Sequence, residues 1–155
     1  MVQVVEVARY LVHLAANCSD EPDYLTHLRL QKLLYYVQGW SLALLGRPMF
    51  SDRIEAWAHG PVVRDAYRRF ADKGGRAILP SDFDETDDFA LDDVERELIA
   101  SVWEMLKDHS ALSLRKMTHE EPPWMDAHRG YGPADLCQEE ITKDAMKAYF
   151  ETLAE

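Results

Sequence analysis

Apolar residues recur every three or four positions along most of the chain, which is the spacing of amphipathic helices. In residues 3–18, Val4, Ala8, Leu11 and Ala15 follow this spacing. The same periodicity, read together with capping residues and helix breakers, predicts about six helices. These are expected over residues 3–18, 26–45, 61–73, 94–107, 111–119 and 142–153.

Residues that cap helices mark several of these boundaries. Hydroxyl or carboxylate side chains stand just before the periodic stretches, where they can accept hydrogen bonds from unpaired backbone N–H groups. Such positions are Thr26, Asp92 or Asp93, Ser110 and Thr142. Gly46 is suited to end the second helix. Pro61 is expected to begin the third, because proline is tolerated in a first helical turn.

The segment between the second and third helices lacks the helical period. Ile54 and Ala56 alternate with Glu55 and Trp57, which is typical of a short strand. Residues 76–79 form a second short apolar stretch, which we expect to pair with this strand. The chain is therefore predicted to be mainly α. We expect residues 1–155 to form one compact helical bundle with a small antiparallel β element near 53–58 and 76–79.

Charge narrows the classes of function. The 155-residue chain carries a formal net charge of −11. This opposes a general affinity for DNA or RNA, whose phosphates attract Lys and Arg, and it suits a basic protein partner. No apolar run reaches the roughly 18 residues of a membrane span, and the first residues do not resemble a signal peptide. A cytoplasmic protein is the expectation.

Patterns for metal binding and catalysis are incomplete. The acidic loop at 81–93 lacks the glycine and the bidentate glutamate of a calcium-binding loop. The segment HEEPP has Pro123 where a zinc-protease helix needs its second histidine. Glu55, His59 and His119 are the acid–base candidates for an alternative enzymatic reading. The sequence favours a protein that is not an enzyme and that needs no metal or cofactor.

One segment is rich in basic residues, although the chain as a whole is acidic. Its cationic residues are Arg64, Arg68, Arg69, Lys73 and Arg76. Three interpretations stay open: a solvated helix face, a surface that meets acidic residues, or a DNA-recognition helix over 61–73. The last makes a DNA-binding transcriptional regulator the alternative function.

The stretch LQKLLYYVQGW, residues 30–40, combines apolar and polar positions in one helix. Leu33, Val37 and Trp40 lead a predicted core face. A second arc of about 140° is led by polar or aromatic residues that carry little charge. Its members include Gln31, Lys32, Tyr35 and Gln38. Either this arc is solvated or covered by the rest of the chain, or it forms a groove for a partner.

Three segments together resemble a known family. They are LQKLLYYVQGWSLALLGRPMF, RIEAWAHGPVVRDAYRRF and LSLRKMTHEEPPWMDAHRG, in this order. In combination they look like the Panacea domain of SocA-type antitoxins and of related GepA-like phage-associated proteins. The resemblance runs from about Val4 to Phe150.

The resemblance implies an antitoxin that neutralises a cognate toxin, usually encoded by an adjacent gene, by direct contact. The toxin would be sequestered or delivered to a cellular protease, and a homodimer stays open. With the arc above, it suggests partner-binding residues: Gln31, Lys32, Tyr35, Gln38, Glu55, Trp57, His59 and His119. The positions assigned to the fold are Leu33, Trp40, Gly60, Pro61, Val62, Pro123 and Trp124.

Overall fold

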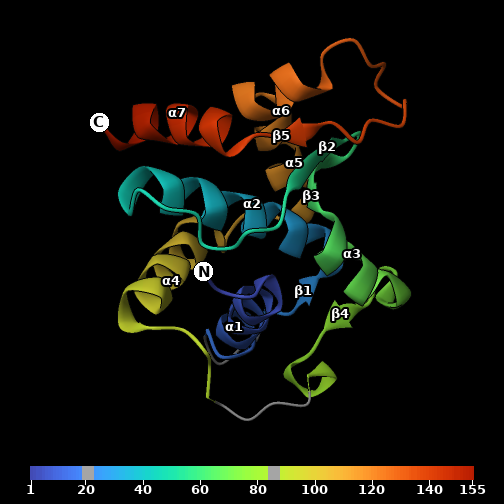
Figure 1. The fold of residues 1–155 in the computed structure, drawn as a ribbon. Coiled ribbons are helices and arrows are strands. Elements are labelled where there is room, and N and C mark those ends of the chain that lie inside the picture. Colours follow the sequence, from blue (N-terminus) through green and yellow to red (C-terminus); the bar gives the residue numbers. More distant parts are fainter. Residues whose placement is uncertain (19–22, 84–87) are drawn as a thin grey trace.

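The computed structural model describes residues 1–18, 23–83 and 88–155, and in these ranges the chain is mainly helical (Figure 1). The α-helices are α1 (Val4–Ala16), α2 (His27–Leu44), α3 (Arg64–Phe70), α4 (Asp93–Leu106), α5 (Ala111–His119), α6 (Pro122–His128) and α7 (Lys143–Ala154). The strands are β1 (Leu25–Thr26), β2 (Ile54–Trp57), β3 (Gly60–Val63), β4 (Ala77–Ile78) and β5 (Glu140–Ile141). Short 3-10 turns lie at Ala71–Lys73 and Pro80–Asp82. The predicted class, a mainly α bundle with small antiparallel sheets, is confirmed.

The predicted helix caps are also confirmed. The side chains of Thr26, Asp92, Ser110 and Thr142 each accept a hydrogen bond from the backbone N–H three residues later. At α4 the cap is reciprocal, because the Glu95 carboxylate accepts from the N–H of Asp92 at 2.8 Å. These boundaries follow from local chemistry, which is why the sequence locates them.

The β elements differ from the prediction in two ways. The expected helix start at Pro61 is wrong, because residues 60–63 form β3 and helix α3 begins at Arg64. The expected pairing of 53–57 with 76–79 is wrong as well. Strand β2 lies between β3 and β5, whereas β4 pairs with β1. A two-residue turn joins β2 to β3, and this short closure favours their pairing, while the other edge of β2 pairs with the distant β5.

Helix α2 runs through the middle of the molecule and is covered on nearly every side (Figure 1). Helix α7 lies along one side of it, α4 and α1 pack on another, and β3 and α5 cover a third. Fourteen of its 18 residues are buried. Leu33 and Val37 of the predicted core face are buried as expected, and the second arc is covered as well, which was one of its two alternatives. Trp40, expected in the core, is only half-buried, whereas Gln31 and Gln38 are 0% exposed.

Gly39 explains how closely α7 approaches α2. A Cβ atom at this position would lie 2.2 Å from the Phe150 ring. The ring also makes edge contacts with Tyr35, Tyr36 and Trp40. The α2–α7 contact therefore requires a residue without a side chain at position 39.

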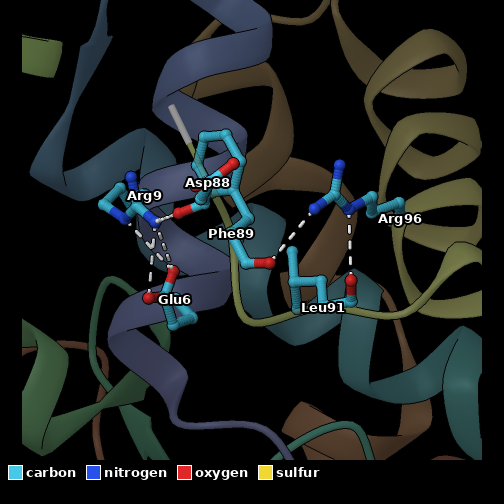
Figure 2. Close-up of polar contacts among 6 residues, drawn as sticks. All are labelled: Glu6, Arg9, Asp88, Phe89, Leu91 and Arg96. Atoms are coloured by element: carbon cyan, nitrogen blue, oxygen red, sulfur yellow. Dashed lines mark hydrogen bonds and ion pairs between the residues drawn. The ribbon is translucent and has the colours of Figure 1, made fainter. Parts of the chain in front are cut away.

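Two arginines hold the end of the acidic loop between α1 and α4 (Figure 2). Arg9 of α1 forms an ion pair with Glu6, donates to the carbonyl of Asp88 and lies 4.0 Å from the centre of the Phe89 ring. Arg96 of α4 donates to the carbonyls of Phe89 and Leu91. Asp84 and Thr86, two of the acidic loop's oxygen-bearing residues, lie outside the described residues.

Candidate functional site

The two glutamines of α2 bind backbone groups of the same chain. The Gln38 amide donates to the carbonyl of Phe50 at 2.8 Å and accepts from the N–H of Met49 at 2.8 Å. The Gln31 carbonyl oxygen accepts from the N–H of Val63 at 2.8 Å. Of the two alternatives for this arc, the structure shows that the chain itself covers these residues. Any part that they have in partner binding stays a prediction.

Tyr35 and Tyr36 meet a buried carboxylate. Their hydroxyls donate to the two oxygens of Glu121, each at 2.9 Å, and the Tyr149 hydroxyl also bonds to Glu121. Burial raises the pKa of Glu121, and the three hydrogen bonds partly oppose that rise. Burial, followed by the nearby Glu121 charge, also raises the pKa of both Tyr35 and Tyr36. We call Tyr35, Tyr36, Tyr149 and Glu121 the tyrosine–glutamate cluster.

Glu55 of β2 is surrounded by donors. Its carboxylate accepts from the Trp57 indole at 2.8 Å, from Arg64 at 2.9 Å and from Arg53 at 3.2 Å. Only 2% of the residue is exposed. Two cations and an indole satisfy Glu55, so this side chain ties α3 to β2.

The three segments that resemble the Panacea domain come together at the β2–β3 turn, Ala58–His59. The His119 ring, at the end of α5, has Nε2 at 2.7 Å from the carbonyl of Ala58 and Nδ1 at 2.6 Å from that of Arg115. The Trp124 indole donates to the carbonyl of Trp57 at 2.8 Å. The HEEPPW element therefore contacts the backbone of β2 and of the β2–β3 turn, and both ring nitrogens of His119 face backbone carbonyls.

Lys32 lies against the other side of this turn. The residue is 2% exposed, and its Nζ donates to the carbonyl of Pro61 at 3.3 Å. Gly60 makes room for it: φ is +113°, and a Cβ there would lie 2.6 Å from Lys32 Cε. Burial, followed by the Arg115 charge, lowers the pKa of Lys32 to about 7. Glycine is therefore required at position 60 for two reasons: the backbone is left-handed there, and the Lys32 side chain occupies the space of a Cβ atom.

Lys32 forms part of the wall of a cavity of about 230 Å³ between α2, the β2–β3 turn and α5. Its lining residues are Leu28, Lys32, His59, Ala111, Leu112 and Arg115. We call it the basic cavity. Burial, followed by the charges of Lys32, Arg115 and His27, lowers the pKa of His59 to about 4, so His59 is neutral at pH 7.

A second hollow of about 580 Å³ shares Leu112 and Arg115 with the basic cavity. It continues along α5 past Ser110, Ser113, Lys116 and His119. Leu112 is 73% exposed and Leu28 is 41% exposed, so apolar side chains border the entrance. Helix α5 contains no acidic residue, and its solvent side is therefore apolar and basic on an acidic protein.

The structure separates the predicted partner-binding residues. Lys32 and His59 line the basic cavity, and His119 lies in the adjoining hollow. Gln31, Tyr35, Gln38 and Glu55 are internal, and Trp57 is half-buried. Sequence reasoning missed Arg115, Leu112 and Leu28 as neighbours of Lys32. The exposed apolar positions of α5 were the available signal, but their proximity to Lys32 depends on the fold.

The basic segment proposed as a DNA-recognition helix is short. Helix α3 has seven residues, and Arg64 is committed to Glu55. Lys73 forms an ion pair with Asp82 at 2.8 Å. Arg68 and Arg69 are exposed. DNA binding by this segment stays a prediction.

The described ranges contain neither a metal-binding cluster nor a membrane-spanning helix. No group of three or more His, Cys, Asp or Glu residues in 1–18, 23–83 or 88–155 is placed to hold a metal ion. Across the same part of the chain, none of the helices has both the length and the apolar character to cross a membrane.

Comparison with known proteins identifies the family. Residues 30–125 match the model of the antitoxin SocA-like family, Panacea domain, and this is more than half of the 155 residues. The chain belongs to this family. It is also similar to Antitoxin SocA of Caulobacter vibrioides (strain NA1000 / CB15N), with 42% identity over 73 residues. That alignment covers 47% of this chain and 37% of the relative. No solved structure matches.

Proposed function

We propose that this chain is an antitoxin that neutralises a protein toxin by binding it directly. Membership of the antitoxin SocA-like family carries the proposal, and the name of the Caulobacter relative supports it. The net charge of −11 suits a basic toxin, since opposite charges speed association. The partner is expected from an adjacent gene and in the cytoplasm.

We further propose that the chain acts without catalysing a reaction. The three acid–base candidates point to different places, since His59 lines the basic cavity, His119 the adjoining hollow and Glu55 a third hollow beside α3. Glu55 is neutralised by two arginines, and both nitrogens of His119 face backbone carbonyls. General acid–base catalysis needs such groups within reach of one substrate atom.

Co-expression tests the proposal. The product of an adjacent gene is expressed alone and together with this chain. We expect growth arrest in the first case, and growth with a co-purifying complex in the second. Growth arrest that this chain does not relieve, with no complex, would contradict the antitoxin assignment.

The fate of the bound toxin distinguishes two mechanisms. Sequestration predicts that toxin persists in growing cells in an inactive complex. Delivery to a protease predicts that the half-life of the toxin shortens when this chain is present and recovers in a protease-deficient strain. Pulse-chase measurement of the toxin separates these outcomes.

A further inference from the structure

We propose that the basic cavity receives a carboxylate side chain of the toxin, carried on an apolar segment that packs against α5. This inference rests on the proposed antitoxin function and gives it a contact point. The cavity lies between Lys32 of α2, His59 of the β2–β3 turn and Arg115 of α5.

The first support is a buried cation with too few partners. An ammonium group has three N–H donors, and buried donors are normally satisfied. Lys32 is 2% exposed, yet within the described residues its Nζ donates only to the carbonyl of Pro61, at the long distance of 3.3 Å. The nearby charge of Arg115, another cation, disfavours the protonated form of Lys32 further. A carboxylate placed between them would supply the missing acceptors.

The second support is the state of the neighbouring polar groups. Arg115 is exposed, and within the described parts of the chain its guanidinium has no ion pair or hydrogen bond, so it is available to a ligand. His59 Nδ1 and Gln31 Nε2 are buried atoms without a hydrogen-bond partner in the described structure. On the same helix, Gln38 and Tyr35 have side-chain partners, whereas His27 Nδ1 and Arg29 Nε lack one. Two residues that line the cavity, Lys32 and His59, therefore have buried polar atoms whose hydrogen bonds are incomplete or absent.

The third support is the way the sequence keeps this arrangement. A residue other than glycine at position 60 would need a left-handed backbone and would displace the end of Lys32. His119 and Trp124 fix the turn from its other side. The lysine is therefore aligned before any ligand arrives, which reduces the ordering that binding requires.

The border of the cavity indicates what else the ligand carries. Leu112 and Leu28 are exposed beside the opening, and Arg115 and Lys116 flank the adjoining hollow. An acidic residue on an apolar segment complements this surface in both charge and polarity. Its negative charge would lie between Lys32 and Arg115, and this pairing would fix the register of the complex.

Binding measurements with a catalytically inactive form of the toxin test the proposal. We expect Lys32→Met and Arg115→Glu each to weaken binding by at least about 30-fold, as loss of one partner of a buried charge pair does. Arg68→Glu is the matched control, since Arg68 is exposed on α3 away from the cavity, and it should change binding by less than about 3-fold. Circular dichroism melts establish that each variant is folded.

A double-mutant cycle locates the carboxylate. Each Asp and Glu of the toxin is changed to Ala, and binding is measured to the wild-type chain and to Lys32→Met. One toxin residue should weaken binding strongly to the wild type and have little further effect with Lys32→Met. In the complex, NMR of the Lys32 side chain should show its pKa raised above about 7, because a carboxylate would offset burial and the opposing charge of Arg115.

Three outcomes would overturn the proposal. Tight binding that Lys32→Met and Arg115→Glu do not alter would place the toxin elsewhere and leave the antitoxin function intact. Loss of self-association alone in these variants would make a second copy of this chain the occupant. Competition by inorganic phosphate, with no toxin carboxylate coupled to Lys32, would make the cavity a phosphate site. Failure of the wild type to bind or rescue is a different result, which contradicts the antitoxin function itself.

Discussion

The tyrosine–glutamate cluster and the basic cavity lie next to each other on α2, yet they differ in how their charges are satisfied. Glu121 accepts hydroxyl hydrogen bonds from Tyr35, Tyr36 and Tyr149. Lys32 lies one turn before Tyr35 and Tyr36 on α2. Its Nζ has a single carbonyl acceptor at 3.3 Å, and the residue lines the basic cavity together with another cation, Arg115.

Burial therefore does not distinguish the fold from the site in this protein, because Tyr35 and Lys32 are both nearly inaccessible. The difference lies in the completeness of the hydrogen bonds. A satisfied buried network rigidifies the core, whereas an unsatisfied one is a cost that something must offset. We interpret the first as structure and the second as a binding site.

Removal of the carboxylate from the tyrosine–glutamate cluster should have the largest effect. Glu121→Ala leaves the Tyr35 and Tyr36 hydroxyls buried without an acceptor. The free energy of unfolding should fall by about 3–5 kcal/mol. Urea denaturation measures this, with Glu120→Ala as the control, since that neighbour is exposed. A loss below about 1 kcal/mol would mean that the cluster is not structural.

Gln38→Ala should have the next largest effect. The change removes the partners of Met49 N–H and Phe50 C=O, both buried. We expect a loss of about 2–4 kcal/mol in the free energy of unfolding. Gln138→Ala, at an exposed position, is the matched control. An unchanged melting temperature would show that Gln38 does not stabilise the fold, and would support the alternative that its helical arc binds a partner.

The pH dependence of stability should show whether the pKa of Lys32 is lowered in the folded chain. The pKa of Lys32 is about 7 in the folded chain and near 10.5 when unfolded, so between these values the unfolded state binds one more proton. Stability then rises with pH, by at most about 1.4 kcal/mol per pH unit from this group. The difference between wild type and Lys32→Met isolates it. If that difference stays constant from pH 7 to 9, Lys32 has an ordinary pKa.

At pH 7 the same substitution should have the smallest effect on stability. Lys32→Met replaces a poorly satisfied buried cation with an apolar side chain of similar length. The free energy of unfolding should stay within about 1 kcal/mol of the wild type, or increase. Thermal melts at pH 7 measure this. A loss of more than about 2 kcal/mol would show that Lys32 supports the fold as Glu121 does, and the contrast between the two clusters would fail.

Prediction from the sequence succeeded where the signal is local and failed where it is not. The caps at Thr26, Ser110 and Thr142 were located correctly, because each depends on a few neighbouring residues. The helix expected to begin at Pro61 begins at Arg64 instead, because residues 60–63 form strand β3. Proline is acceptable in both, and the pairing of Gly60 with Trp57 decided between them.

The same limit applies to the candidate site. Lys32 and His59 were identified, and the structure brings them to one cavity. Gln31, Tyr35 and Gln38 were identified with them, but they bind other parts of the chain. A helical arc shows only which side chains point the same way. It carries no information about what covers them.

The sequence by itself determined most of the helices, their caps, the mainly α class and the resemblance to the Panacea domain. Periodicity, capping and motif order are all properties of residues that are neighbours in the sequence. Only the tertiary structure decided which polar residues of α2 are satisfied. The partner of Tyr35 is 86 residues away in Glu121, and Arg115 reaches Lys32 from α5. Hydrogen bonds between residues so distant in sequence form only when the chain has folded, and the difference between the two clusters depends on them.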